Sequence, residues 1–317
     1  MDNITLLVPL KDRARHTKRF MNSLQDASCP FKVLIADGGK DEEIQYILSN
    51  PESYPGLNYE YIRYPYDESL DHFHEKMSDA ASRIATPLAA AVDNDDILQI
   101  DGFKRCIDIL KNPMYSSARG RVDNTSGQNM YGKFPDPITG KTAFARMVDQ
   151  TKHFHGNWHN VTRSNHIKAC WSMINAVKPQ NFRFTEQLSG YLNIVWGNSY
   201  RGDFPWLIHY NEERIKTENG SLQDHFPDQS TWINSDYWLD EFNKMTEAVG
   251  VAIAHHDGIS IGDAMDKFLE SYPYKLPNLN KLLKKRILEA KELGYNEKRI
   301  DKLFSIVKEC DVTKSRV

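Results

Sequence analysis

Cysteine is scarce in this chain of 317 residues. The four cysteines are scattered, and they form neither a Cys-x-x-Cys pair nor the spacing of a zinc site. They are Cys29, Cys106, Cys170 and Cys310. This pattern argues against a disulfide framework and a zinc-stabilised fold, and it indicates buried or incidental thiols in a reducing compartment.

Long apolar runs and an excess of one charge are also missing. No window approaches the roughly 18 apolar residues of a membrane span, and Met1-Asp2-Asn3 lacks the basic and apolar regions of a signal peptide. Lys and Arg total 40 against 43 Asp and Glu, so no overall positive charge favours nucleic acid. Internal repeats and low-complexity segments are absent as well. We therefore expect a cytoplasmic globular protein that does not bind nucleic acid.

The amino-terminal part instead shows a regular alternation of apolar segments and helical patterns. The expected strands are Ile4–Leu10, Phe31–Asp37, Asn58–Tyr64 and Ala89–Val92, and a helix is expected over residues 70–84. This alternation predicts βαβ units on a mostly parallel sheet, hence an α/β fold. No Gly-x-Gly-x-x-Gly follows the first strand, which argues against a Rossmann oxidoreductase.

The central motif is Asp93-Asn94-Asp95-Asp96, directly after the apolar run Ala89–Val92. Burying a carboxylate costs several kcal/mol unless it is paired or metal-bound. The cluster is therefore expected at the open carboxyl end of a strand, where oxygen ligands suit Mg²⁺ or Mn²⁺. The alternative is that Asp95 and Asp96 cap the next helix. Asp37 also ends a strand, and we expect it to share the same crevice.

The remaining chain is less regular and then becomes helical. Glycines and prolines interrupt residues 113–160, which indicates a functional loop or a small excursion of the chain, not a linker. That region ends in Lys152–Asn160, whose three histidines favour a ring-binding surface or plain packing over a zinc site. We expect a helix over Ser164–Val177, another opening at Thr185-Glu186-Gln187, a strand over Gly202–His209, and helices from about residue 228. The basic amphipathic tail indicates a helical cap; the alternative is a surface that contacts anionic lipid or a partner.

Three segments in this order resemble the amino-terminal half of GT-A-fold glycosyltransferases, family 2 in particular. They are Val8–Arg13, Ile35–Asp41 and Val92–Asp96. Asn160–Ser164, Phe184–Glu186 and Pro205–Arg214 extend the resemblance more weakly to residues 4–222. It implies a catalytic domain over 1–222, with a nucleotide-sugar half (1–112) and an acceptor half (113–222), followed by a helical extension over 223–317.

The resemblance also implies roles for individual residues. Asp95 would bind Mn²⁺ or Mg²⁺ beside the donor diphosphate, with His209 as a second candidate ligand. Asp93 would contact the ribose or a metal-bound water, and Asp37 would accept a hydrogen bond from uracil or a similar base. The complete set expected to bind the nucleotide sugar is Pro9, Leu10, Asp12, Arg13, Asp37, Gly38, Lys76, Asp93 and Asn94.

Glu186 matches the position of the family's acidic catalytic residue and is the expected general base. The family usually continues Glu-Asp, whereas Gln187 follows here, and an alternative role for Glu186 is to stabilise a helix N-terminus. Asp203 and Glu212 are the fallback bases. Trp158, His159, Tyr191, Trp196 and Tyr200 are candidates for a sugar-stacking platform, and Tyr131–Lys141 for a lid.

The expected function is metal-dependent, inverting transfer of a sugar from a UDP-sugar to a hydroxyl of a glycan or other acceptor, in surface polysaccharide biosynthesis. The expected location is the cytoplasm, with peripheral contact to the membrane through the basic tail as an option. One alternative is a nucleotidyltransferase, although Lys11–Arg15 has cations without the glycines of a triphosphate loop. The other is a non-catalytic nucleotide- or glycan-binding protein, which the Glu186-Gln187 departure favours.

Overall fold

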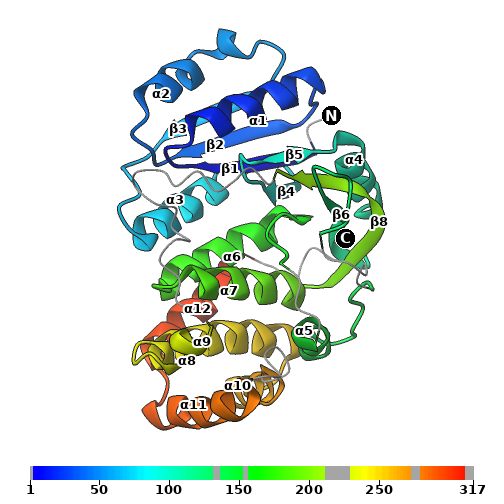
Figure 1. Ribbon diagram of the computed structural model, residues 1–317. Helices are drawn as coiled ribbons and strands as arrows, with labels where there is room; N and C mark the ends of the chain where they lie inside the picture. The colour runs from blue at the N-terminus through cyan, green and yellow to red at the C-terminus, as the bar shows by residue number, and fades with distance from the viewer. Residues whose placement is uncertain (1–2, 131–135, 153–155, 211–228, 273–278, 311–317) are drawn as a thin grey trace. The chain divides into compact units, whose positions relative to one another are not determined.

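The computed structural model describes residues 3–130, 136–152, 156–210, 229–272 and 279–310 (Figure 1). The chain divides into two compact units. Unit 1 comprises Met1–Pro137, Trp158–Lys168 and Ser199–Ile215, and unit 2 comprises Ile138–Asn157, Ala169–Asn198 and Lys216–Val317. Among the helices within the described ranges, none combines the length and apolarity needed to cross a membrane.

Unit 1 is built on an eight-stranded sheet with the order β3-β2-β1-β4-β7-β6-β8-β5. Its strands are β1 (Ile4–Leu10), β2 (Lys32–Asp37), β3 (Tyr59–Arg63), β4 (Leu88–Ala91), β5 (Asp96–Leu98), β6 (Tyr115–Asn124), β7 (Val161–Arg163) and β8 (Asn198–His209). The pairs β1–β2, β2–β3 and β1–β4 are parallel. The pairs β4–β7, β6–β7 and β5–β8 are antiparallel. The α/β class is confirmed, with a mixed sheet that is parallel from β3 to β4 and has antiparallel pairs beyond β4.

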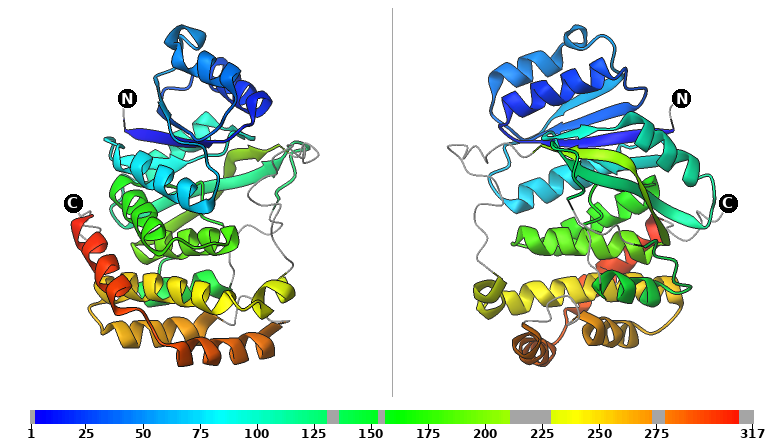
Figure 2. Two further views of the ribbon diagram at one scale, coloured as in Figure 1. Left: turned by 90° about the vertical axis from the view of Figure 1, so that its left-hand side faces the viewer. Right: turned by 45° about the vertical axis from the view of Figure 1, so that its right-hand side comes forward.

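Helices cover both faces of the parallel half of this sheet. They are α1 (Ala14–Asp26), α2 (Glu42–Ser49) and α3 (Leu70–Ser82), and α4 (Ile100–Ile109) follows β5; a short 3-10 turn, η1, spans Pro51–Ser53. Figures 1 and 2 show α1 and α2 on one face of β1 to β3 and α3 on the other. On α1, Phe20, Met21 and Leu24 recur at helical spacing and are almost fully buried. Each such side chain contributes about 1.5–3 kcal/mol of hydrophobic stabilisation.

Unit 2 is helical. Its helices are α5 (Ala143–Lys152), α6 (Ser164–Val177, shared with unit 1), α7 (Phe182–Val195), α8 (Gln229–Asn234), α9 (Trp238–Asp257), α10 (Ile261–Ser271), α11 (Asn280–Leu293) and α12 (Glu297–Glu309). The central helix is α9, which packs against α7, α10, α11 and α12. Its Trp238 and Phe242 rings stack with centroids 4.5 Å apart. Tyr191 and Trp196, two candidates for a sugar platform, are buried in the core of this unit.

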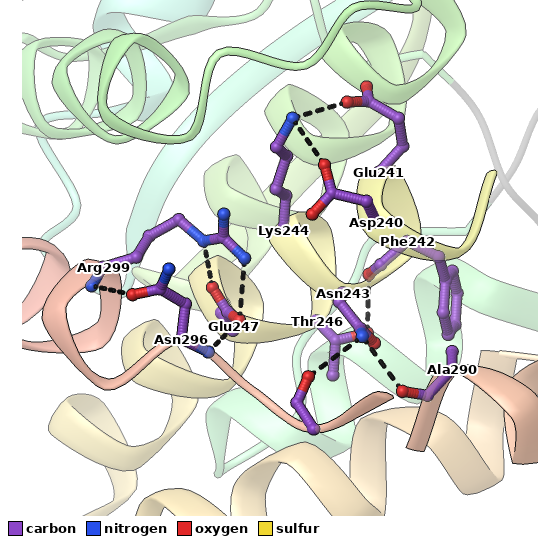
Figure 3. A network of polar contacts seen from close by, with 11 residues as sticks. Asp240, Glu241, Phe242, Asn243, Lys244, Thr246, Glu247, Ala290, Asn296 and Arg299 are labelled. Carbon is purple, nitrogen blue, oxygen red and sulfur yellow. Dashed lines mark hydrogen bonds and ion pairs between the residues drawn. The ribbon is translucent and has the colours of Figure 1, made fainter. Parts of the chain in front are cut away.

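A polar network fastens α11 and α12 to α9 (Figure 3). Glu247 on α9 is fully buried and accepts hydrogen bonds from Arg299 Nη2 at 2.9 Å and from the Asn296 backbone N–H at 2.8 Å. Asn243, one turn earlier, donates to the carbonyl oxygens of Ala290 at 3.0 Å and Gly294 at 3.2 Å. Polar groups at the ends of α11 and α12 are thus satisfied from within α9.

Three local predictions were wrong. The region 113–160 contains β6 and α5; a Cβ on Gly120 would lie 2.5 Å from the Phe204 carbonyl oxygen, so this glycine marks close strand packing and not a loop. The helix expected to open at Thr185 begins at Phe182, because the Asn181 side chain caps it by accepting from the Arg183 N–H. Asp96 begins β5 and does not cap α4, which starts at Ile100.

Candidate metal and nucleotide-sugar site

The acidic motif lies in unit 1, between the end of β4 and the start of β5. Two antiparallel strand pairings bring distant histidines to it. The β4–β7 register pairs Ala89 with Thr162, and its continuation places His159 beside the first residues after β4. The β5–β8 register pairs Asp96 directly with His209. The sheet topology therefore places two imidazoles, those of His159 and His209, beside the acidic loop.

Three of these side chains form a candidate metal site. His159 Nε2 lies 3.6 Å from Asp93 Oδ2 and 3.5 Å from Asp96 Oδ2. Among the described residues, Asp93, Asp96 and His159 can bring ligand atoms within 4.8 Å of one another. His159 Nδ1 lies 3.1 Å from the Ala91 carbonyl oxygen. Because a carbonyl only accepts, Nδ1 carries a hydrogen, and Nε2 faces the two carboxylates.

The donor set fits a divalent cation. Ligand atoms sit roughly 2.0–2.2 Å from Mg²⁺, Mn²⁺ or a similar ion, so two ligands of one ion are about 3 Å apart. The separations of 3.5 and 3.6 Å between imidazole nitrogen and carboxylate oxygens are close to that spacing. An imidazole lone pair facing two carboxylates is repulsive unless a proton or a metal ion lies between them. A cation between these three side chains would satisfy the arrangement.

His209 supports this cluster from the other side of Asp96. Its Nδ1 lies 2.8 Å from Asp96 Oδ1, and this hydrogen bond raises the pKa of His209. Asp96 is 1% exposed, and each of its carboxylate oxygens faces an imidazole. Partial burial and the nearby Asp95 and Asp96 carboxylates raise the pKa of Asp93 to about 6. Such a shift is typical of acidic groups gathered at a functional site.

The other half of the loop faces α1. Asn94 Nδ2 donates to Thr17 Oγ1 at 2.9 Å, and Asp95 Oδ2 accepts from Arg13 Nη2 at 2.8 Å. The Asp95 carbonyl oxygen also accepts from Arg19 Nη2 at 3.1 Å. Although burial acts in the opposite direction, the Arg13 guanidinium lowers the pKa of Asp95. Asp95, the residue predicted to bind the metal, thus contacts Arg13 in this structure, and its role as a ligand stays a prediction.

The residues predicted to contact the base lie at the carboxyl ends of β1 and β2. Asp37 is 3% exposed and accepts from the Gly39 N–H at 2.8 Å and from Tyr61 Oη at 2.7 Å. Leu10 pairs with Asp37 in the β1–β2 register, and Pro9 precedes it. A Cβ on Gly38 would lie 2.4 Å from the Asp67 carboxylate, so only glycine fits there. β1 lies between β2 and β4 in the sheet. Asp37, the last residue of β2, and Asp93, just after β4, therefore lie at the carboxyl ends of the two strands that flank β1.

Lys76 and Asp12 make polar contacts at the carboxyl end of β1. Lys76 is buried, its Nζ donates to the Leu10 carbonyl oxygen at 3.0 Å, and it forms an ion pair with Asp67. Burial lowers the pKa of Lys76 and raises that of Asp67, against the attraction between them. Asp12 has a φ of 47°, and its Oδ1 accepts from the Lys40 N–H. These contacts place Lys76 in a structural pair, and its predicted contact with the nucleotide stays untested.

Glu186, the predicted base, lies in unit 2 on the exposed side of α7. The neighbouring Gln187 is buried, and its Oε1 accepts from Tyr272 Oη at 2.7 Å. The fallback base Asp203 is 70% exposed and pairs with Arg121 at 2.6 Å. Glu212, the histidines at 153 and 155, and the first part of the proposed lid Tyr131–Lys141 lie outside the described residues.

Solved structures with the same architecture were found by structural comparison. S. aureus TarS matches with a TM-score of 0.56 at 12% identity, over 100% of this chain and 54% of that chain. TarS 1–349 in complex with UDP-GlcNAc matches with a TM-score of 0.57 at 11% identity, over 98% of this chain and 91% of that chain. The complex of TarS 1–349 with UDP gives a TM-score of 0.54 at 10% identity, over the same shares of 98% and 91%.

This chain has a GT-A-like fold. The resemblance noted in the sequence is thereby confirmed at the level of fold. The chain spans about half the length of the longer TarS structure. No family model matches the sequence, and no curated protein matches it either.

The sequence pattern does not bring Asp96 and His159 together. It gives a helix cap as an alternative role of Asp96, and a ring-binding surface or plain packing for His159. The signal that could have located His159 is its position just before the short segment Val161–Arg163. The resemblance implies a short strand at Asn160–Ser164 that leads into a helix, and β7 and α6 confirm it. Only the antiparallel pairing of this strand with β4 brings His159 back to the acidic loop.

Proposed function

We propose that this protein is a metal-dependent glycosyltransferase that moves a sugar from a UDP-sugar to a hydroxyl group of an acceptor. The observation that carries this proposal is the cluster of Asp93, Asp96 and His159 after β4 of a GT-A-like sheet. The complexes of the structurally similar TarS with UDP and UDP-GlcNAc support a uridine nucleotide as the donor. We further propose a role in polysaccharide biosynthesis, and the proposal does not name the transferred sugar.

Each group in the site has a distinct task under this proposal. Asp93, Asp96 and His159 would hold a divalent cation, Mn²⁺ or Mg²⁺, which offsets negative charge on the diphosphate. Asp37 accepts a hydrogen bond from the base, and its contacts with Tyr61 and the Gly39 N–H fix its orientation. Inverting transfer needs a base that takes the proton of the acceptor oxygen as it attacks the anomeric carbon, while UDP leaves from the opposite face; Glu186 is the candidate for this base that the sequence resemblance implies.

Two alternatives remain as competitors. A nucleotidyltransferase would also use an acidic metal site, but Lys11–Arg15 contains no glycine for a triphosphate loop. A binding protein without catalytic activity was favoured by Gln187 after Glu186. Since Gln187 accepts a buried hydrogen bond from Tyr272, a structural requirement accounts for the amide at this position. This structural role of Gln187 weakens the argument for a non-catalytic protein, which the nucleotide-hydrolysis assay tests.

The donor site is tested by thermal unfolding with UDP and UDP-GlcNAc, each with and without Mn²⁺. A ligand at a hundred times its dissociation constant stabilises the native state by about 2.7 kcal/mol. We expect a rise in Tm that requires both nucleotide and Mn²⁺, and slow UDP release from the sugar nucleotide. The control Asp108→Asn changes an exposed carboxylate on α4 and should retain the full shift. Absence of any nucleotide-dependent shift in the wild type at millimolar concentration contradicts the proposal.

A finer proposal concerns location. The predicted domain boundary at residue 222 lies outside the described residues, and the helices beyond it include the basic helix α11. Its exposed side carries Lys281, Lys284 and Lys285 around Leu288, which is 62% exposed. Two acidic residues lie near them: Glu292 is exposed, and Glu289 pairs with Lys285 at 3.5 Å. Lysines flanking an exposed leucine suit an anionic lipid surface. We infer that α11 can bring the protein to a membrane.

Charge reversal on α11 tests this inference. Each lysine near an anionic bilayer contributes about 1 kcal/mol. The triple variant Lys281→Glu, Lys284→Glu, Lys285→Glu is therefore expected to weaken binding to phosphatidylglycerol vesicles by about a hundred-fold or more in sedimentation. The matched control reverses three exposed lysines of α12, Lys298, Lys302 and Lys308, and should bind like the wild type. Equal loss in both variants, or equal wild-type binding to phosphatidylcholine, contradicts a lipid surface on α11.

A further inference from the structure

We propose that Tyr61 is a positioning residue that holds the Asp37 carboxylate so that the site selects uracil over cytosine. This inference rests on the proposed function, in which Asp37 accepts a hydrogen bond from the base. It adds the side chain that orients this carboxylate and the consequence for the choice of nucleotide. Three features of unit 1 carry it: the burial of Asp37, the two hydrogen bonds that its oxygens accept, and the fixed backbone of the turn after β2.

The Asp37 carboxylate has little freedom to turn. Asp37 is the last residue of β2 and is 3% exposed. One oxygen, Oδ1, accepts from the Gly39 N–H at 2.8 Å, and the other, Oδ2, accepts from Tyr61 Oη at 2.7 Å. An ionised carboxylate has about four lone-pair sites and only accepts hydrogen bonds. Each oxygen is therefore held by a donor of this chain and keeps a further lone pair, in a fixed direction, for a ligand.

Tyr61 reaches Asp37 from the neighbouring strand. The parallel β2–β3 register pairs Tyr61 with Ile35, and Ile35 lies on the same face of β2 as Asp37 because side chains alternate along a strand. Partial burial and the hydrogen bond to Asp37 raise the pKa of Tyr61. The phenol therefore stays protonated across the physiological pH range, and it remains a donor to the carboxylate.

The backbone of the turn after β2 is fixed as well. The Gly38 N–H donates to the Leu10 carbonyl oxygen at 3.0 Å, and the Gly39 carbonyl oxygen accepts from Gln45 Nε2 at 3.0 Å. A binding group held by a rigid scaffold loses little conformational entropy when its ligand arrives. Within this fixed turn, Tyr61 supplies a side-chain contact that orients the carboxylate itself.

A carboxylate in a fixed direction distinguishes the two pyrimidine bases. Uracil carries an N–H at ring position 3, which can donate to Asp37. Cytosine has a lone pair on the same nitrogen, which repels the carboxylate and leaves a buried acceptor without a partner. A site built to bind a donor of one substrate rejects an analogue that lacks it. Because a carboxylate free to rotate could instead meet the exocyclic amino group of cytosine, the discrimination depends on the hydroxyl group of Tyr61.

The test compares UDP with CDP on the full chain, each measured by calorimetry at saturating Mn²⁺. The wild type is expected to bind UDP at least about a hundred-fold more tightly than CDP. Tyr61→Phe should weaken UDP binding about ten-fold and leave CDP binding within about two-fold, because it loses a hydrogen bond to a charged group and with it the orientation of Asp37. Circular dichroism and the Tm of each variant establish that it is folded.

Tyr59→Phe is the matched control on the same strand. The Tyr59 Oη donates at 2.8 Å to the Asn50 carbonyl oxygen and not to Asp37. This variant loses a tyrosine hydroxyl group of the same kind and should keep the wild-type ratio of UDP to CDP affinity. A general loosening of β3 would instead change both variants alike and would weaken both nucleotides equally.

A double-mutant cycle decides whether Tyr61 acts through Asp37. If it does, Tyr61→Phe with Asp37→Asn together weaken UDP binding no more than Asp37→Asn alone, because residues in one hydrogen-bond network are not additive. Additive losses, equal weakening of UDP and CDP by Tyr61→Phe, or the same change of selectivity in Tyr59→Phe overturn the proposal. If the wild type binds UDP and CDP equally well, this inference fails and the proposed function stands. If the wild type binds neither nucleotide, the proposed function fails as well.

Discussion

Replacing Asp96 by asparagine is expected to lower Mn²⁺-dependent UDP release from the sugar nucleotide by about a hundred-fold or more, the usual effect of removing one electrostatic contact to a transition state. Asp96 is 1% exposed and lies between His159 and His209. Asparagine keeps the shape of the side chain and an oxygen for the hydrogen bond with His209, but it removes the charge that favours a cation. The measurement is the rate of UDP release as a function of Mn²⁺ concentration.

The same variant has a second readout that does not depend on activity. Asp93, Asp95 and Asp96 crowd their charges into one loop, and removal of one charge relieves repulsion in the metal-free protein. We therefore expect Asp96→Asn to unfold at a Tm equal to or above that of the wild type without metal, and to lose the rise in Tm that Mn²⁺ produces. Asp108→Asn on α4 is the matched control. An Asp96→Asn protein with normal activity and a normal Mn²⁺ shift would contradict the assignment of this site.

The sequence was most informative where a segment is apolar throughout or has a clear helical period. The strand Ile4–Leu10 and the helix Ser164–Val177 were predicted with the bounds that the structure has. In both segments the order of apolar and polar residues along the chain is enough to predict the element, without information on the residues that it packs against. The Asp-rich end of the fourth strand was also located correctly, because carboxylates after a buried strand have few stable places to lie.

Long-range pairing is what the sequence could not show. His159 reaches Asp93 and Asp96 only through the β4–β7 register, and His209 reaches Asp96 only through the β5–β8 register. Both registers join segments far apart in the chain, with no periodic signal to reveal them. Lys76 is a similar case, because its burial against Asp67 depends on how α3 packs and not on its own neighbours. The resemblance implies the short strand at Asn160–Ser164, but a strand of three residues, Val161–Arg163, carries too little pattern to show which strand it pairs with.

The buried ion pair of Glu247 and Arg299 is expected to dominate the stability of the carboxyl-terminal helices (Figure 3). Glu247→Ala should lower the free energy of unfolding of unit 2 by about 3–5 kcal/mol, because removal of one partner leaves the other charge buried and unpaired. Glu247 has no exposed surface, and Arg299 is 18% exposed. The alanine also deprives the Asn296 N–H of its acceptor. Urea unfolding measures the loss.

Two further variants separate charge from shape in this network. Glu247→Gln keeps an oxygen for Arg299 and Asn296, so we expect a smaller loss of about 1.5–3 kcal/mol, the contribution of hydrogen bonds to a charged group. Asp240→Ala removes a carboxylate of the same helix that is 63% exposed and pairs with Lys244 at 3.0 Å. An exposed pair contributes only about 0–1 kcal/mol. If Glu247→Ala and Asp240→Ala unfold at the same urea concentration, the network does not fasten α12 to α9. Faster hydrogen exchange confined to α11 and α12 in Glu247→Ala would instead show that these helices detach before the rest of unit 2 unfolds.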